Sequence, residues 1–439
     1  MRYLLDIPFE IYGQAIKRKK HYTTMGKVTQ VIGLIIQVEG LEVFIGELCE
    51  ILIKSSEKVV QAEVVGFKGH TVLLMPLAEL EGIGPECLVR PTGKSLKVKI
   101  SDDLLGRTLD GLGNPMDKNI SIKGKLYDIN RKPPNPFERR KIEKVMSTGI
   151  KAIDGTLTCG EGQRIGIFAG SGVGKSTLLG MMAKYSDADV NVIALIGERG
   201  REVLEFIQKD LGPEGYKKSV VVCATSDQPP LVRLKGAFVA TTIAEYFRDQ
   251  GKKVVLMMDS VTRFAMAQRE IGLATGEPPT TRGYTPSVFA LLPKLLERSG
   301  MSKNGSITAF YTVLVEGDDM NEPIADAVRG ILDGHIILSR KIAAKNHFPA
   351  IDIQNSVSRI MKEIVSEEHY ETAGKLKENL AIYSDSEDLI NVGAYIKGSN
   401  PIIDKAIDLN IPINDFLKQG IDEKYSYEET LEILKSLVI

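Results

Sequence analysis

The sequence predicts a multidomain protein in which an N-terminal β-barrel precedes a central α/β domain with a mostly parallel sheet and a C-terminal α-helical domain. Short β-rich runs separated by turns fill residues 25–93. Beyond residue 160, continuous apolar runs alternate with helical stretches, and charged helical sequence follows residue 365. A chain of 439 residues is also too long for a single hydrophobic core.

The composition is typical of an ordinary soluble protein, with 43% hydrophobic and 26% charged residues. There are 56 basic and 57 acidic residues, which give a formal net charge of −1. No global field therefore recruits nucleic acid or an anionic membrane. The start of the chain lacks the long apolar run of a signal peptide. No window approaches about 18 uninterrupted apolar residues, so we expect no membrane span.

The four cysteines lie far apart in the sequence: Cys49, Cys87, Cys159 and Cys223. They form no CxxC pair and have no histidine pair nearby, so neither a zinc site nor a disulfide framework is expected. Reduced thiols in a cytosol fit this pattern better.

Residues 1–24 are expected to form a separate N-terminal docking segment. A short helix is predicted after Pro8, and the basic run Lys17–Lys20 follows it. Two interpretations stay open. The helix could pack on its own protein or fray as a terminus, or it could dock on a partner or a lipid surface.

The β-barrel domain is expected over residues 25–93. Its clearest strand-like runs are Lys27–Val31, Leu34–Val38, Val59–Val65 and Thr71–Met75. Strands this short, with glycines between them, favour a small closed barrel over an open sheet. Residues 106–117 then read as turn-rich sequence, and Pro133–Pro136 reads as an extended connector.

The central domain is expected over residues 94–365. Its strand-like runs are Arg164–Ala169, Val190–Ile196, Ser219–Ala224, Val254–Met258, Ile307–Val315 and His335–Ser339, and its helical stretches include Lys175–Lys184 and Leu231–Arg248. Buried strands that alternate with helices predict a parallel sheet covered on both faces. The remaining residues, 366–439, are expected to form a small helical domain, because Glu363–Tyr383 and the sequence after Asn400 are helical in character.

A glycine-rich loop connects the first of these strands to the helix that follows it. The run Ala169–Ser176 reads AGSGVGKS, and it has alanine where the P-loop pattern usually begins with glycine. Gly170, Gly172 and Gly174 still allow successive backbone N–H groups to turn toward one anion at the positive end of a helix. We therefore expect ATP phosphates to bind Gly170, Ser171, Gly172, Val173, Gly174, Lys175, Ser176 and Thr177. Within this set Lys175 would reach the β- and γ-phosphates, and the Ser176 hydroxyl would ligate Mg²⁺.

Two acidic residues follow other strands of the predicted sheet. Asp259 ends the apolar run Lys253–Met258, and we expect it to hold Mg²⁺ through water. Glu198 ends a different strand and is the best candidate to polarise the attacking water. From spacing alone, a solvated Glu198 paired with Arg199 or Arg201 is an equally good interpretation.

Four segments together resemble the α/β-subunit superfamily of rotary ATPases, namely AGSGVGKST, LIGERGRE, VVLMMDSVTRFA and PAIDIQNSVSR. More narrowly, residues 276–300 and 315–340 resemble the type III protein-export ATPases, and within them the flagellar branch. The resemblance covers nearly the whole chain from about residue 25 to residue 439. It implies a β-barrel domain, a RecA-like nucleotide domain and a C-terminal helical domain. It also implies a homohexamer that binds ATP between subunits.

The resemblance also implies roles for individual residues. Glu198 matches the catalytic glutamate, and Arg199 and Arg263 match arginines near the phosphates and that glutamate. Arg359 matches an arginine finger that enters the neighbouring subunit's site. Phe348 matches the aromatic residue that stacks on adenine, and Tyr427 could match a second wall of that pocket. Ordinary packing remains the alternative for both rings.

The function implied is ATP hydrolysis by a ring that energises type III export of flagellar proteins, by releasing chaperones and delivering substrates to the export gate. An injectisome secretion ATPase is the alternative. A rotary ATP synthase subunit fits less well, because the tail lacks an acidic DELSEED-like loop. A Rho-like RNA translocase is disfavoured by the near-neutral charge.

The partners implied are a stator-like regulator, stalk-like coiled-coil export proteins, the export gate and chaperone–substrate complexes, with no nucleic acid. The expected location is the cytoplasm, peripheral at the inner face of the cell membrane.

Overall fold

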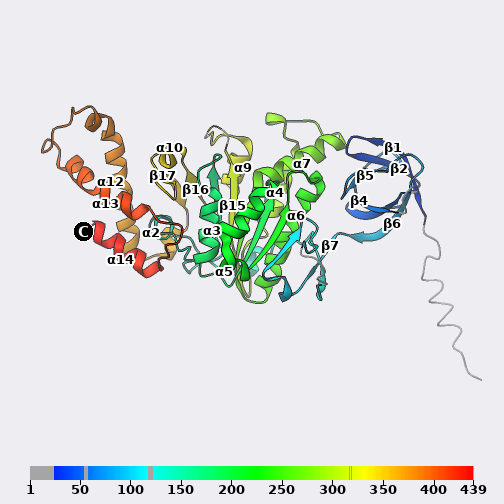
Figure 1. Ribbon diagram of the computed structural model, residues 1–439, viewed down its shortest axis with the longest axis horizontal. Coiled ribbons are helices and arrows are strands. Elements are labelled where there is room, and N and C mark those ends of the chain that lie inside the picture. The colour runs from blue at the N-terminus through cyan, green and yellow to red at the C-terminus, as the bar shows by residue number, and fades with distance from the viewer. Residues whose placement is uncertain (1–23, 54–57, 117–121, 316, 318, 439) are drawn as a thin grey trace, which may run out of the picture. The chain divides into compact units, whose positions relative to one another are not determined.

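The computed structural model describes residues 24–53, 58–116, 122–315, 317 and 319–438. These residues form two compact units, of which the first contains the chain up to Leu96 together with Ala274–Gly276. Residues 1–23, which make up almost all of the predicted N-terminal docking segment, lie outside the described residues. The fold class expected from the sequence is confirmed, with a barrel, a mostly parallel sheet and a helical region (Figure 1).

The first unit contains a closed six-stranded barrel with the strand order β1-β2-β5-β4-β3-β6. Its strands are β1 (Gly26–Ile32), β2 (Ile35–Glu39), β3 (Glu47–Leu52), β4 (Val59–Lys68), β5 (Thr71–Pro76) and β6 (Leu88–Ser95). Side chains alternate between buried and more exposed positions along β3, as expected when one face of a strand lines the barrel interior. The interior is filled by aliphatic side chains such as Val38, Ile51 and Leu74.

The second unit is built on a nine-stranded sheet with the order β17-β16-β10-β15-β13-β11-β12-β8, to which β14 adds beside β15. Its strands are β8 (Arg107–Asp110), β10 (Arg164–Ala169), β11 (Val190–Ile196), β12 (Ser219–Ala224), β13 (Lys253–Asp259), β14 (Gly300–Met301), β15 (Ser306–Leu314), β16 (Gly334–Leu338) and β17 (Ile351–Ser358). All pairings are parallel except those of β14 and β17. A separate two-stranded ribbon joins β7 (Lys97–Ile100) to β9 (Lys125–Asp128).

Helices connect these strands and cover the sheet. The longer ones are α3 (Lys175–Tyr185), α6 (Pro230–Asp249), α7 (Val261–Thr275), α8 (Pro286–Leu296) and α9 (Pro323–Ile331), and the shorter ones are α2 (Lys151–Thr156), α4 (Gly200–Glu205), α5 (Gly212–Lys217) and α10 (Arg340–Ala344). Helix α6 packs over β11, β12 and β13, while α3 packs against a π-helical turn at Phe206–Leu211. The central strands are therefore buried, which explains their continuous apolar sequence.

The helical region contains α12 (Glu367–Asn391), α13 (Pro401–Leu417) and α14 (Tyr427–Val438), preceded by the short α11 (Met361–Ile364). Its buried side chains Leu376, Phe416 and Leu434 belong to the same hydrophobic core as Ile153 of α2 and the neighbouring sheet. The helical region is thus packed against the nucleotide domain and shares its core.

Three local expectations differ from the structure. The turn-rich segment 106–117 contains strand β8, which pairs with β12 at the sheet edge before the turn begins. The helical stretch predicted from Glu363 is broken at Val365, because Ser366 caps a new helix by accepting a hydrogen bond from the His369 backbone N–H at 3.2 Å. That helix continues to Asn391, past the predicted end at Tyr383.

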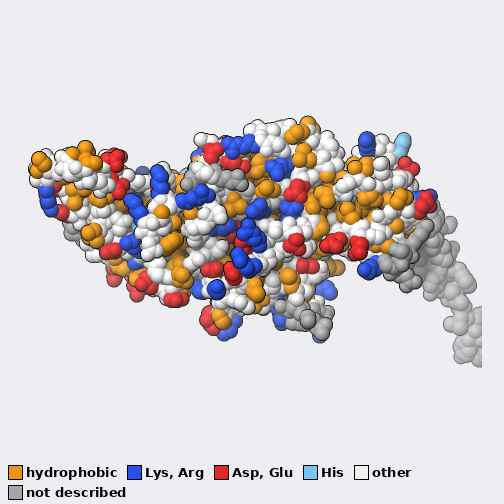
Figure 2. Space-filling view, turned by 45° about the horizontal axis from the view of Figure 1, so that its top comes forward, with side chains coloured by type: hydrophobic (Ala, Val, Ile, Leu, Met, Phe, Trp, Pro, Cys, Tyr) orange, Lys and Arg blue, Asp and Glu red, His pale blue; other side chains and the backbone are white. Residues whose placement is uncertain are grey.

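Exposed apolar side chains gather on part of the helical region. Figure 2 shows hydrophobic side chains at the far end of the helical region, where the α12–α13 connection lies. Leu389, Val392, Ile396 and Ile402 are exposed there. Among the described residues, no helix is long and apolar enough to cross a membrane.

Candidate active site

The glycine-rich loop lies where the sequence predicts it, between β10 and α3. Gly172 and Gly174 have φ values of +77° and +83°, a conformation that side chains other than glycine rarely adopt. Gly174 is the N-cap residue of α3 and supplies no side-chain cap. The first N–H groups of α3 therefore lack a side-chain cap at the positive end of the helix, which suits an anion.

Lys175 sits at the centre of an acidic cluster. Its Nζ lies 2.5 Å from Asp259 Oδ1 and 3.7 Å from Glu198 Oε1. Burial disfavours the ammonium charge, but the two carboxylates outweigh this cost and raise the pKa of Lys175. The Thr312 hydroxyl donates a 2.7 Å hydrogen bond to the same Asp259 oxygen. The carboxyl-terminal ends of β10, β15, β13 and β11, four neighbouring strands, thus bring these groups together.

Glu198 follows β11 and is mostly buried, with 17% of its side chain exposed. Desolvation and the nearby negative charge of Asp259 raise its pKa to about 7, although Lys175 opposes the shift. A hydrogen bond with Glu202 contributes in the same direction, and the pKa of Glu202 falls correspondingly despite partial burial. A carboxyl group poised near neutral pH is suited to accept a proton from water.

The two predicted arginines after Glu198 occupy different environments. Arg263 on α7 packs against Gly197, where an added Cβ would lie only 2.8 Å from Arg263 Cβ. Its buried Nε has no hydrogen-bond partner among the described residues, so it is free to meet an acceptor in the site. Arg199 is exposed, and its Nη1 donates to Glu202 Oε1 at 2.9 Å. Only Arg263 is held within the cluster by packing.

Two further contacts of the loop were not predicted. A Cβ on Gly170 would lie 2.6 Å from Arg340 Nε, so the Arg340 guanidinium covers the start of the loop. The Thr177 side chain hydrogen-bonds Asp210 of the π-helical turn. No spacing rule in the sequence indicates either contact.

Arg359 lies at the amino-terminal ends of the parallel strands, opposite the ends that carry the glycine-rich loop. Strand β17 runs antiparallel to β16, so its final residue, Ser358, pairs with Gly334 at the start of β16. The Arg359 N–H donates to Asp333 O at 3.1 Å, and the Asp333 N–H donates to Arg164 O at the first residue of β10. The six residues of β10 span about 20 Å at ~3.3 Å per residue. This distance is far beyond the reach of an arginine side chain, so Arg359 cannot serve its own loop.

Phe348 lies beside the loop, about 3.4 Å from where a Cβ on Gly174 would be, and 41% of it is exposed. A cavity of about 430 Å³ adjoins it, which Lys151, Asp415, Gln419, Glu423 and Tyr425 also line. Gln419 fixes this wall, because its N–H donates to Phe348 O at 3.0 Å and its side chain accepts from the Lys151 N–H at 2.8 Å.

Tyr427 does not line this cavity. Its hydroxyl hydrogen-bonds His369 Nδ1 at 3.0 Å, and His369 Nε2 bonds Gly155 O, so the ring belongs to the packing of α14 against α12 and α2. The expectation for Tyr427 is therefore corrected: Tyr425, two residues earlier, faces Phe348. The Lys151 ammonium lies 4.4 Å from the centre of the Tyr425 ring.

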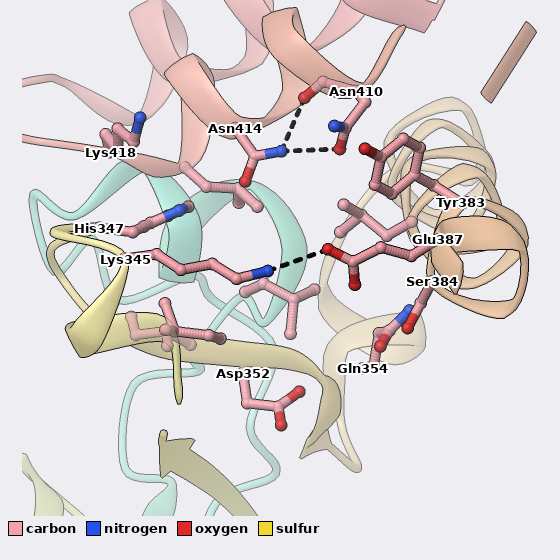
Figure 3. A pocket seen from close by; sticks show the side chains of 15 residues that line it. Lys345, His347, Asp352, Gln354, Tyr383, Ser384, Glu387, Asn410, Asn414 and Lys418 are labelled. Carbon is pink, nitrogen blue, oxygen red and sulfur yellow. Dashed lines mark hydrogen bonds and ion pairs between the residues drawn. The ribbon is translucent and has the colours of Figure 1, made fainter. Parts of the chain in front are cut away.

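A second cavity, of about 390 Å³, separates β17 and α10 from α12 and α13 (Figure 3). Lys345 and Glu387 point toward each other across it and form a 3.1 Å ion pair. His347, one residue before Phe348, also lines it, and burial and the charge of Lys418 lower the pKa of His347. Phe348 is therefore adjacent to a polar junction between the sheet and the helical region.

Comparison with known proteins agrees with this architecture. Residues 149–358 match the nucleotide-binding domain of the ATP synthase alpha/beta family, and residues 28–93 match its beta-barrel domain. Residues 365–436 match the T3SS EscN ATPase C-terminal domain.

Relatives match over nearly their full length. The chain is 57% identical to a flagellum-specific ATP synthase of Bacillus subtilis over 96% of this chain and 97% of the relative. It is 55% identical to a type 3 secretion system ATPase of Xanthomonas euvesicatoria, covering 94% and 93% of the two chains.

Among solved structures, the assembled ATPase EscN of enteropathogenic E. coli aligns with a TM-score of 0.90 at 49% identity, covering 94% of this chain and all of that one. The same ATPase in complex with its central stalk EscO aligns with a TM-score of 0.87 at 48% identity and the same coverage. The chain is an ATPase that belongs to the ATP synthase alpha/beta family, within its type III protein-export branch.

Proposed function

We propose that this chain hydrolyses ATP as a homohexameric ring and thereby energises type III export of flagellar proteins. One observation carries the ring arrangement. The phosphate-binding loop, Asp259 and Glu198 lie at the carboxyl-terminal ends of the parallel strands, while Arg359 lies at their amino-terminal ends. Each chain therefore presents half a site on each of two edges, and the next copy completes it.

The phosphate side of the site is formed by this chain's own residues. The N–H groups at the start of α3 and the Lys175 ammonium would hold the β- and γ-phosphates. Mg²⁺ fits the donors present, because the Ser176 hydroxyl and the Asp259 carboxylate are hard oxygen ligands and Mg²⁺ usually takes the rest from phosphates and water. When bound, the ion would neutralise charge on the phosphate oxygens.

Glu198 would accept a proton from water as the water oxygen attacks the γ-phosphorus, and the bond to the ADP oxygen breaks. Arg263, whose Nε is unpaired among the described residues, would donate to a phosphate oxygen or orient Glu198. Arg359 of the neighbouring copy would stabilise the charge that develops on the γ-phosphoryl group. Arg199 would act only at the entrance, since its side chain is exposed.

The adenine base would stack on Phe348, with Tyr425 as the second wall of the cavity. We expect Tyr425→Ala to raise the KM for ATP about ten- to a hundredfold, because stacking of a base on an aromatic ring is worth roughly 1–3 kcal/mol. Steady-state ATPase assays measure this change. The matched control is Tyr427→Phe, which removes only the hydroxyl that bonds His369 and should leave KM unchanged. A KM raised by the control variant alone would contradict the assignment.

The exposed apolar area on the α12–α13 connection suits a coiled-coil partner, because Leu389, Val392 and Ile396 are all exposed there. We assign this area to a stalk-like export protein. A stator-like regulator, the export gate and chaperone–substrate complexes complete the proposed set of partners. The proposed location is the cytoplasm, at the inner face of the cell membrane.

A deletion strain tests the flagellar assignment. Loss of swimming, restored by the wild-type chain and not by Lys175→Ala, is the expected result. Normal swimming together with loss of an injectisome-dependent phenotype would instead assign the chain to type III secretion.

A further inference from the structure

The fully exposed Phe137 is a feature that the proposed mechanism does not use. It lies in the connector between the β7–β9 ribbon and α2, within a short 3₁₀ turn at Pro136–Glu138. Its relative exposure is 99%, the highest among the exposed large hydrophobic residues described. A whole phenyl ring in water leaves its apolar area unburied, so covering it in an assembly would be favourable.

The connector holds Phe137 in a fixed position. Asn135 Oδ1 accepts a hydrogen bond from the Phe137 N–H at 3.1 Å, and Pro134 and Pro136 lie on either side of Asn135 in the sequence. Directly after it, Arg139 Nη1 donates to Ser299 O at 2.9 Å and Arg140 Nε donates to Ser302 O at 3.1 Å. These hydrogen bonds therefore hold the turn that presents the Phe137 side chain.

A polar network joins this anchor to the residue predicted to act in the neighbouring site. Arg139 forms an ion pair with Glu297, Glu297 forms one with Arg164, and Arg164 forms one with Asp333. Asp333 O then accepts the hydrogen bond from the Arg359 N–H. The two carboxylates raise the pKa of Arg164 despite its burial, so this network stays charged. Phe137 and Arg359 thus both lie toward the amino-terminal ends of the parallel strands, opposite the phosphate-binding loop.

We propose that Phe137 is an intersubunit anchor that seats on the loop-bearing edge of the next copy of this chain. The inference rests on the proposed hexameric ring. The next copy of the chain is the partner, because Phe137 lies on the same side of the sheet as Arg359. The network from Arg139 to Asp333 then fixes the position of the anchor relative to the arginine finger. Docking of the Phe137 phenyl ring on the next copy would bring Arg359 to the phosphates bound there.

Replacing the Phe137 side chain tests this inference. Phe137→Ala should raise the protein concentration that gives half-maximal specific ATPase activity about ten- to a hundredfold, as expected for losing the burial of one phenyl group. Activity at saturating protein concentration should be kept. The matched control is Ile411→Ala, which removes an apolar side chain that is 71% exposed on α13 of the helical region. Thermal unfolding of dilute protein should be unchanged in both variants, because neither side chain packs in the monomer.

A labelling experiment gives an independent readout. All four native cysteines are buried, so Phe137→Cys introduces a single accessible thiol. Its reaction with a maleimide should slow at least about tenfold as protein concentration rises through the activity transition, whereas Ile411→Cys should react at a constant rate. If activity still rises with concentration while the thiol at position 137 stays reactive, the anchor is refuted and the ring stands. If activity never depends on concentration and the active protein is a monomer by size, the ring itself fails.

Discussion

Replacing Arg359 with alanine should lower the ATP turnover of the assembled protein by about 10³–10⁵-fold, the range known for arginine fingers. The side chain is exposed and its Nη2 donates to Arg329 O at 3.2 Å, so the substitution should leave the monomer fold intact. Nucleotide affinity of dilute protein should change little, because about 20 Å of strand β10 separates Arg359 from its own loop.

Mixed assemblies distinguish action in the neighbouring site from action in the same chain. Arg359→Ala and Glu198→Gln proteins should each be nearly inactive, and mixing them should restore part of the activity. In mixed rings, some sites combine an intact Glu198 with a neighbour's intact Arg359. Arg359→Lys is a useful comparison, since it keeps the charge but loses the planar fork that grips phosphate, and most of the loss should persist. Absence of rescue in verified mixed rings would count against the trans arrangement.

The phosphate side of the site was predictable because it depends on local sequence. The loop follows a continuous apolar strand and opens a helix, and Asp259 and Glu198 each come directly after another such strand. In a parallel sheet, the carboxyl ends of neighbouring strands meet at one edge, so the cluster with Lys175 follows from topology.

Short and irregular strands were harder to predict. Strand β6 contains Pro91 and Gly93, and its pairing with β3 is irregular near Glu47, so its sequence reads as a turn. Strand β8 has only four residues and is recognisable mainly by its pairing with β12. Neither strand carries a periodic signal strong enough to outweigh the turn residues around it.

Contacts between distant segments could not be read from motifs. Tyr425 and Tyr427 are two residues apart. Which of them lines the cavity depends on the direction in which the chain enters α14. His369, which also hydrogen-bonds Gly155 O, holds the half-buried Tyr427, while Lys151 contacts Tyr425 at the cavity. Such choices depend on tertiary packing of α12 and α2, which leaves no mark in the local sequence.

Glu198→Gln should lower turnover by about 10²–10⁴-fold, the usual contribution of a general base, while ATP binding is retained. The amide has nearly the same shape and removes only the proton-accepting oxygen. It also removes a buried negative charge next to Asp259, so nucleotide affinity should stay the same or rise. Lys175→Ala provides the contrast, because it should lose both binding and turnover. Equilibrium binding of a fluorescent ATP analogue, measured beside the steady-state rate, separates the two outcomes.

The pH dependence of the wild-type rate tests the same role more directly. Because burial and Asp259 raise the pKa of Glu198 to about 7, the proton-accepting form is populated only above that value, and turnover should rise with pH through neutrality. Glu202 hydrogen-bonds Glu198 and adds negative charge beside it, so Glu202→Gln should move the midpoint of this rise to lower pH. An exposed carboxylate that only paired with Arg199 would titrate near its ordinary value, and Glu202→Gln would then leave the profile where it is. A flat profile across neutral pH, with ATP binding intact, would remove Glu198 as the base.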